Sequence, residues 1–394
     1  MLRSLYAGIS GLRSHQTMLD VTGNNIANVN TTAFKSSSTQ FQDTLSQLTQ
    51  GAGGPQAGAG GTNPAQVGLG VLVAGVSTNF AQGSTQATGR ATDLMISGDG
   101  FFVTRSGNQT SYTRAGTFDF DAEGRLTTPD GSLVQGWGAV DGQITAGGQL
   151  GNITLPLNAV SPGRATTTAT LGGNLPSDSA AGAVLVREVE VFDASGAARS
   201  LTLTFTKTAG GWNVAGSDPQ NPAGPATGTA DLTFVDGVQT SAGALAVGGI
   251  AVDLSTVAGS AKLTTVAVTG TDGRDAGTLE SYTLSKDGTL IGSFSNGASV
   301  ALARVVLASF TNPAGLEKTG GSSYRATFNS GDPQIGAPGA DGFGSVTSGA
   351  LEMSNVDLSQ EFTNLIVAQR GFQANARIIT TSDEVLQELT NLKR

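Results

Sequence analysis

The chain has 394 residues, a formal net charge of −9 and few charged residues, which disfavours the clustered Lys and Arg of a nucleic-acid-binding protein. It has no cysteine and one histidine, which excludes disulfides, thiolate metal sites and metal sites that need several histidines. Glycine, with 57 residues, suits short strands joined by tight turns. This composition indicates several β-rich domains, and we expect no cofactor and no metal.

The N-terminal stretch, residues 1–28, predicts a helix with one apolar stripe. The stripe comprises Leu5, Leu12, Leu19 and Ile26, which are spaced by seven residues, and Ile9, which lies four residues after Leu5. Such a repeat is typical of a helix that buries a narrow face against another helix. The start of the chain lacks the apolar core of a cleavable signal peptide, and we expect no membrane-spanning helix.

The next stretch is expected to stop the helix and then connect it to a β domain. Asn24, Asn25 and Asn28 lie where asparagine competes for backbone hydrogen bonds and favours turns. Residues 36–70 are rich in Ser, Gln, Thr and Gly, with glycines dense over 51–61, which is typical of a flexible linker.

The middle of the chain predicts β structure throughout. Short apolar runs between Gly and Asp turn signals indicate strands over residues 71–145, and a second β region covers 146–275. Its clearest element is a hairpin, in which residues 188–192 and 201–206 alternate between apolar and polar side chains. Residues 276–349 return to the character of the first β region.

The C-terminal stretch, residues 356–394, predicts a second long helix. Its stripe comprises Leu358, Leu365, Phe372, Ile379 and Leu386, which are again spaced by seven residues, and Phe362, which lies four residues after Leu358. Three further +4 positions, Gln369, Asp383 and Thr390, are polar, which a two-stranded coiled coil tolerates poorly. Matching stripes at the two ends predict that the terminal helices pack together and form an assembly interface.

Catalytic and metal-binding alternatives find little support. His15 lies beside the N-terminal stripe and is expected to pack there. The Asp-Gly sequences at 98–100 and 270–275 lack the remaining ligands of a calcium loop, so turn chemistry explains them. We therefore expect no catalytic residue and no enzyme activity.

Several motifs resemble a known family. The N-terminal run from Tyr6 to Leu12, the sequence around Asn24, Asn25, Ile26, Ala27 and Asn28, and the later Thr31, Phe34 and Lys35 resemble the signature of bacterial flagellar axial proteins of the rod and hook. Residues 93–103, 112–118 and 349–389 resemble further signatures of this family, and the tail is closer to the hook type than to the rod type. Rod proteins are expected to be shorter, because they lack the outer domain.

The resemblance implies a mainly β fold with helical termini and two nested β domains. In that arrangement, residues 71–145 and 276–349 form an inner domain, residues 146–275 are inserted as an outer domain, and the helices form a coiled-coil-like layer. The resemblance implies a structured but irregular connector, instead of a flexible linker, over residues 29–70 and 350–355. It implies an extracellular helical homopolymer that couples rod to filament and transmits torque as a universal joint.

The resemblance also implies partners for this polymer. These are the rod protein, the hook cap, the hook–filament junction proteins and the flagellar type III export apparatus, without nucleic acid or membrane insertion. Within such a tube, Gln369, Asp383 and Thr390 are candidates to face a wet central channel. Two alternatives remain open: a distal rod protein, and a secreted β-rich adhesin that would need exposed aromatic residues, for which Trp137 and Trp212 are the only tryptophans.

Overall fold

A computed structural model describes residues 2–391 apart from 56, 57, 59, 141, 157–159, 222–225 and 341. The chain divides into two compact units, which are described separately. The first unit comprises Met1–Leu155, Thr283–Ile291 and Ala301–Arg394, and the second comprises Pro156–Tyr282 and Gly292–Val300. The expected fold class, mainly β with a helix at each end, is confirmed, and the second unit is inserted into the first.

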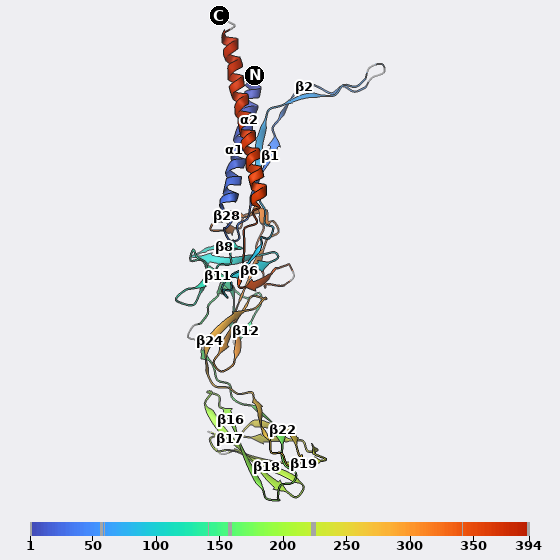
Figure 1. The fold of residues 1–394 in the computed structure, drawn as a ribbon, viewed down its shortest axis with the longest axis vertical. Helices are drawn as coiled ribbons and strands as arrows, with labels where there is room; N and C mark the ends of the chain where they lie inside the picture. The colour runs from blue at the N-terminus through green and yellow to red at the C-terminus, as the bar shows by residue number, and fades with distance from the viewer. Residues whose placement is uncertain are drawn as a thin grey trace. The chain divides into compact units, whose positions relative to one another are not determined.

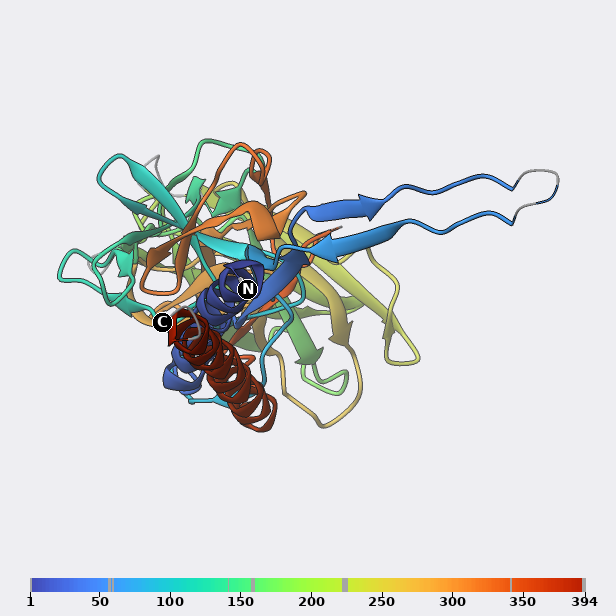
Figure 2. The same ribbon diagram turned by 90° about the horizontal axis from the view of Figure 1, so that it is seen from above.

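The two helices are α1, Leu2–Ala27, and α2, Leu358–Asn391. The start of α2 is capped by Asp357, whose Oδ1 accepts hydrogen bonds from the backbone N–H groups of Ser359 at 2.8 Å and Gln360 at 3.2 Å. A carboxylate at this position satisfies free N–H groups and interacts favourably with the helix dipole. The helices lie side by side and antiparallel (Figures 1 and 2).

Small residues, rather than the striped leucines, allow the two helices to approach closely. A Cβ atom added to Gly371 would lie 2.5 Å from Cε1 of His15, and one added to Gly11 would lie 2.6 Å from Oδ1 of Asn375. Gly8, whose added Cβ would lie 3.3 Å from a side-chain carbon of Ile378, continues the same antiparallel register. The terminal helices therefore pack together as expected, but through glycines that the stripe does not include.

Replacing Gly371 by alanine is expected to destabilise the helix pair by about 1–2 kcal/mol, because the overpacking against His15 outweighs the gain in helix propensity. The matched control is Gly23→Ala in α1, where an added Cβ meets nothing within 4 Å. This control should stabilise α1 by up to about 1 kcal/mol. Thermal unfolding followed by helical circular dichroism measures both changes; destabilisation by both variants, or by neither, would contradict the close packing at Gly371.

Residues 37–78 form a long β-hairpin whose base packs against α1, where the Val71 N–H donates to Ser10 Oγ at 3.2 Å, and whose farther part projects away from the helix pair (Figure 2). Its strands are β1, Ser37–Asp43; β2, Ser46–Gln50; β3, Ala65–Gly68; and β4, Val71–Thr78, with β1 paired to β4 and β2 to β3. The expectation of an irregular connector over 29–70 is therefore wrong where β1, β2 and β3 lie. Long-range backbone pairing orders Ser- and Gln-rich segments that have no apolar pattern of their own. The glycine-rich tip lies partly outside the described residues.

The β part of the first unit surrounds an aromatic core. Phe101, Tyr112, Phe310 and Tyr324 are almost fully buried, and Phe80 packs against them. Its strands are β5 Thr85–Ala87, β6 Leu94–Ser97, β7 Phe101–Ser106, β8 Gln109–Thr113, β9 Asp119–Phe120, β10 Leu126–Thr127, β11 Leu133–Val140, β12 Gln143–Ile144, β13 Gly151–Asn152, β27 Leu307–Ser309, β28 Glu317–Gly320, β29 Ser323–Arg325, β30 Gln334–Gly336, β31 Ser345–Ser348 and β32 Ala350–Glu352, with a short 3₁₀ helix at Pro313–Gly315. The order β11–β7–β8–β29–β28 forms the main sheet. Strand β32 belongs to the segment predicted as connector over 350–355, and it pairs with β5.

Three strands, β24 Gly277–Leu284, β25 Thr289–Phe294 and β26 Ser299–Val305, belong in part to each unit. The other strands of the second unit are β14 Val160–Ser161, β15 Thr168–Asn174, β16 Val184–Phe192, β17 Ala198–Thr208, β18 Gly211–Asp218, β19 Ala226–Val235, β20 Val238–Gln239, β21 Ala244–Val247, β22 Ile250–Ala258 and β23 Ala267–Thr271.

The second unit is built from two sheets that share one apolar core. Their strand orders are β16–β17–β18–β19–β20 and β21–β22–β15–β23, and Leu203, Phe205 and Leu254 are among the core residues with no exposed surface. The predicted hairpin is confirmed: Val189 pairs with Leu201 in the antiparallel β16–β17 register.

Asp272 is expected to make the second unit sensitive to acid. Burial would raise the pKa of this carboxyl, but hydrogen bonds from the backbone N–H groups of Thr167 and Thr168, both at 2.8 Å, and from the Thr167 hydroxyl outweigh it and lower the pKa to about 2. Because the unfolded chain binds this proton near the ordinary value of 3.8, the stabilisation is present above that pH and is lost as the pH falls through about 2.

The variant Asp272→Asn should therefore make the stability of the second unit depend less on pH between 3.8 and about 2. Urea unfolding followed by Trp212 fluorescence, in a Trp137→Phe background, isolates this unit. Glu190→Gln, an exposed carboxyl on β16, removes the same charge as a control. An unchanged pH dependence in Asp272→Asn would contradict the assignment.

Candidate functional site at the base of the terminal helices

The asparagine-rich motif ends α1 and builds the turn that follows it. Asn28 Nδ2 donates to the carbonyl of Asn24 at 2.9 Å, and Thr31 Oγ1 donates to Asn28 Oδ1 at 3.0 Å. Ala33 then adopts a positive φ of 56°, a conformation of tight turns that few L-residues adopt. The motif side chains thus replace the backbone hydrogen bonds that are lost where the helix ends.

Asn25 joins α1 to two other elements. Its Oδ1 accepts from the Ser37 N–H at 3.0 Å, and its Nδ2 donates to the Ser37 carbonyl at 2.8 Å and to Glu361 Oε1 at 3.1 Å. Asn25 is 1% exposed, and a buried amide of this kind requires its partners. One side chain therefore fixes the start of the hairpin and the first turn of α2 against α1.

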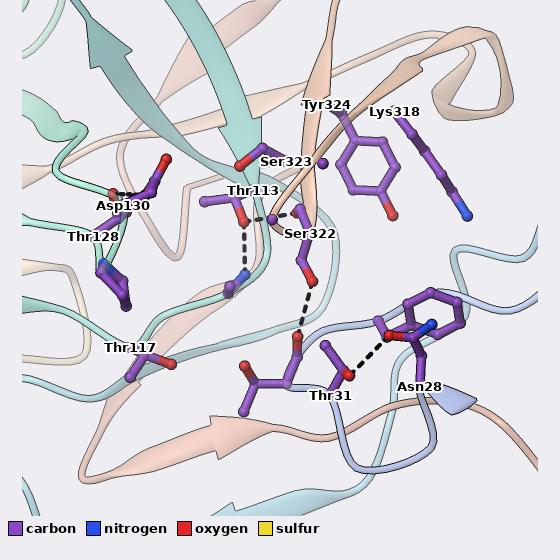
Figure 3. Close-up of a pocket in the computed structure, with 16 residues that line it drawn as sticks. Asn28, Thr31, Thr113, Thr117, Thr128, Asp130, Lys318, Ser322, Ser323 and Tyr324 are labelled. Atoms are coloured by element: carbon purple, nitrogen blue, oxygen red, sulfur yellow. Dashed lines mark hydrogen bonds between the residues drawn. The ribbon is translucent and has the colours of Figure 1, made fainter. Parts of the chain in front are cut away.

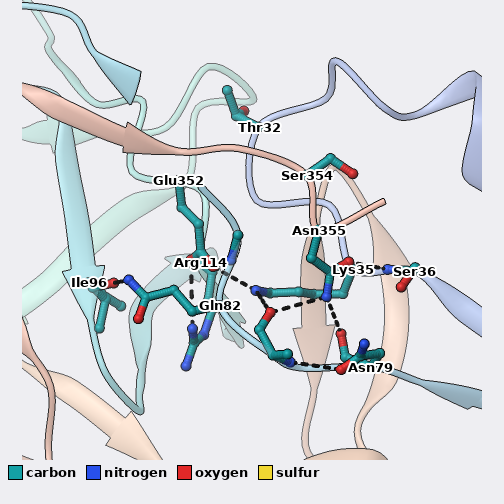
Figure 4. Close-up of polar contacts among 12 residues, drawn as sticks. Thr32, Lys35, Ser36, Asn79, Gln82, Ile96, Arg114, Glu352, Ser354 and Asn355 are labelled. Atoms are coloured by element: carbon teal, nitrogen blue, oxygen red, sulfur yellow. Dashed lines mark hydrogen bonds and ion pairs between the residues drawn. The ribbon is translucent and has the colours of Figure 1, made fainter. Parts of the chain in front are cut away.

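A buried cluster of ionisable side chains lies where the N- and C-terminal parts of the chain meet (Figure 4). Lys35 Nζ donates to Glu352 Oε1 at 2.6 Å and to the Ala81 carbonyl at 2.7 Å, and the side chains of Lys35 and Glu352 have no exposed surface. Glu352 Oε1 also accepts from the Gly83 N–H at 2.8 Å. Arg114, 3% exposed, places Nη1 3.6 Å from Glu352 Oε2. The cluster links residues more than 300 positions apart in the sequence.

Burial sets the protonation behaviour of this region. Burial lowers the pKa of Lys35, and the hydrogen bond and charge of Glu352 oppose that effect only in part. Burial also raises the pKa of Tyr324 to about 12, so its hydroxyl stays protonated at neutral pH. The positive charge of Arg114 contributes to the lowered pKa of Lys35.

Asn355 completes the junction on the C-terminal side. Its Oδ1 accepts from the Ser36 N–H at 2.8 Å, and its Nδ2 donates to the carbonyls of Asn79 at 2.8 Å and Ala81 at 3.1 Å. Its backbone N–H donates to the carbonyl of Phe34 at 3.3 Å. The segment between β32 and α2 is therefore hydrogen-bonded to the segment after α1.

Local sequence pattern predicts no role for Arg114, Glu352 or Asn355, although Arg114 lies in the family motif over residues 112–118 and the other two lie in the motif over 349–389. One feature of the sequence does point to Glu352, because this charged residue stands between the apolar residues Leu351 and Met353. Its partner could not be inferred, since Lys35 lies far away in the sequence.

A pocket of about 480 Å³ opens beside this junction, between the turn after α1, strand β8 and the β28–β29 hairpin (Figure 3). Its labelled side chains are mostly hydroxyls and amides: Asn28, Thr31, Thr113, Thr117, Thr128, Asp130, Lys318, Ser322, Ser323 and Tyr324. Lys318 lies with Nζ 5.2 Å from the ring centre of Phe34 and donates to Ser37 Oγ at 2.9 Å. Among the residues that the structure describes, no group of three or more His, Asp and Glu side chains could hold a metal ion.

The predicted interface residues fall into two groups. Those partly buried in the chain are Leu5, Ile9, Leu12, Leu19, Ile26, Leu365, Phe372 and Ile379. Leu358, Phe362 and Leu386 are exposed, at 40%, 52% and 37%. The same helix exposes Val385 at 47% and Leu389 at 47%, near the end where α2 extends past α1 (Figure 1).

The three polar positions of the stripe, Gln369, Asp383 and Thr390, are exposed on α2. Their solvent-facing placement is compatible with a channel, and the channel itself stays a prediction. Within the described residues, neither helix is long and apolar enough to cross a membrane.

Three family models match separate parts of the chain. They are described as flagella basal body rod protein over residues 5–35, flagellar hook protein FlgE/F/G D1 domain over 95–163, and flagellar basal body rod FlgEFG protein C-terminal over 347–392. Flagellar hook protein FlgE of Borreliella burgdorferi is 38% identical over all of both chains. The chain belongs to the flagellar hook protein family.

Other relatives of this hook-family chain include proteins named for the hook and one named for the rod. Flagellar hook protein FlgE of Escherichia coli is 36% identical over 98% of each chain, and flagellar basal-body rod protein FlgG of Bacillus subtilis is 36% identical over all of both chains. A relative named as a rod protein thus spans the full length, so the expectation that rod proteins are shorter is wrong for that relative. The match to hook proteins supports a structural subunit of the flagellar hook, and the family implies a polymeric assembly.

Proposed function

We propose that this hook subunit polymerises into a flexible tube outside the cell that couples rod to filament and transmits motor torque as a universal joint. In this proposal α1 and α2 form the inner wall of the tube, and the β strands of the subunit lie outside that wall. A repeated head-to-tail contact that does not close into a ring produces such a helical polymer.

The observation that carries the proposal is the exposed apolar surface at the C-terminal end of α2. Val385, Leu386 and Leu389 are 37–47% exposed within a few residues of one another, in a family of polymer-forming proteins. Contiguous apolar surface of this kind marks an interaction site. A second copy of the same chain is the partner that explains it, because the polymer places identical helices side by side.

The proposal also covers the export of the subunit and its partners in the flagellum. The subunit would leave the cell through the flagellar type III export apparatus, assemble beneath the hook cap and contact the rod at one end and the hook–filament junction proteins at the other. It would act as a structural protein without enzyme activity.

The test is the basal body of a strain that lacks the gene for this chain. The proposal predicts complete rods without hooks or filaments in electron micrographs, with hooks restored when the gene is returned. Basal bodies that end before the distal rod would show instead that the chain is a rod subunit. Intact hooks in the deletion strain would contradict both assignments.

A further inference from the structure

The buried cluster at the base of the helices contains the parts of a spontaneous amide-forming site. It brings together an amine, a carboxylate and a side-chain amide, in Lys35, Glu352 and Asn355 (Figure 4). Lys35 Nζ and Asn355 Nδ2 both donate to the Ala81 carbonyl, at 2.7 and 3.1 Å. The nucleophile and the amide group that it would attack thus lie beside one common atom.

The environment favours the neutral amine that such an attack requires. A neutral amino group has two N–H bonds, and Lys35 Nζ donates to two acceptors, Glu352 Oε1 and the Ala81 carbonyl, which leaves its lone pair free for the attack. Arg114 supplies a positive charge to the Glu352 carboxylate, with side chains 3% and 0% exposed. The cluster therefore does not need a second positive charge on Lys35, and burial lowers the pKa of that residue.

The amide is polarised in the direction that the reaction needs. Asn355 Oδ1 accepts the backbone N–H of Ser36 at 2.8 Å, and this donor would stabilise the negative charge that develops on the oxygen as Nζ attacks. Glu352 Oε1, 2.6 Å from Nζ, is placed to accept the proton that the amine loses.

We propose that Lys35 and Asn355 become joined by an intramolecular isopeptide bond. The Lys35 Nζ–Asn355 Cγ bond forms, the Asn355 Cγ–Nδ2 bond breaks, and Glu352 carries the proton from Nζ to the departing nitrogen. Ammonia leaves, and no oxidant, metal or second protein takes part. The bond fastens the segment after α1 to the segment before α2, where pulling on the helices would otherwise separate the two ends of the chain.

The test is mass spectrometry on the purified, folded, full-length protein after denaturation. The expected mass is lower by one ammonia than the mass calculated from the sequence. Trypsin should fail to cut after Lys35 and should release residues 14–90 covalently joined to residues 326–370, because these segments have no other Lys or Arg inside them.

Three variants and one alternative outcome decide the chemistry. Lys35→Arg and the near-isosteric Glu352→Gln should show the full calculated mass, with circular dichroism used to establish that they fold. In Asn355→Asp the same attack would release water and give the same linked mass as the unsubstituted protein. The full calculated mass together with cleavage after Lys35 would overturn the proposal. Loss of water from the unsubstituted protein would overturn the assignment to Asn355.

Discussion

Replacing Glu352 by alanine is expected to lower the free energy of unfolding of the first unit by about 3–5 kcal/mol, the range for breaking a buried ion pair. The variant leaves the Arg114 guanidinium and the Lys35 amino group inside the protein without their carboxylate, and both side chains are almost fully buried. Urea unfolding followed by Trp137 fluorescence, in a Trp212→Phe background, measures the change.

The matched control is Glu317→Ala, which breaks the Arg325–Glu317 pair. That pair has nearly the same separation, 2.7 Å, but its side chains are 53% and 55% exposed. Exposed pairs contribute about 0–1 kcal/mol, so the control should change stability little. Equal effects of the two variants would show that the buried cluster does not hold the first unit together.

Replacing Leu389 by aspartate is expected to abolish polymerisation while leaving the fold of the subunit unchanged. Leu389 is 47% exposed in the free chain, so the change costs the monomer little. At a contact between copies, it would remove the burial of the exposed half of the side chain, about 0.7–1.5 kcal/mol, and leave a charge without a partner. Since about 1.4 kcal/mol corresponds to tenfold and the unpartnered charge adds to this loss, the concentration needed for assembly should rise by at least about tenfold. Sedimentation and negative-stain electron microscopy measure this.

The matched control replaces the adjacent Thr390 by aspartate. It adds the same charge in the same helix turn, but at a position proposed to face the channel, so polymers should still form. Polymers of normal yield from Leu389→Asp would exclude this part of α2 as an interface. Loss of polymers from Thr390→Asp would place that residue in a contact instead of the channel.

The sequence predicted the elements with strong local patterns. The seven-residue stripes predict both helices, and the alternation around Val189 and Leu201 predicts the hairpin of the second unit. The stripe did not identify the closest helix contact, because glycines such as Gly371 carry no hydrophobic signal. The close contact at Gly371 becomes evident only when the side chain of His15 on the facing helix is seen beside it.

The hairpin and the buried cluster show what local pattern leaves out. Strands β1 and β4 pair residues that lie 28 to 41 positions apart in the sequence, and their order comes from that pairing rather than from alternation of apolar residues. The buried cluster depends on Lys35 meeting Glu352 from opposite ends of the chain. The motif around Asn25 marked the candidate site, but only the fold reveals that this residue binds α2 as well as the hairpin.

Image reconstruction of the polymer by electron cryomicroscopy would show which elements join the copies. We expect α1 and α2 to form the innermost layer, Val385, Leu386 and Leu389 to contact a neighbouring copy, and Gln369, Asp383 and Thr390 to face the lumen. Helices on the outer surface, or a polymer joined through the second unit alone, would contradict this expectation.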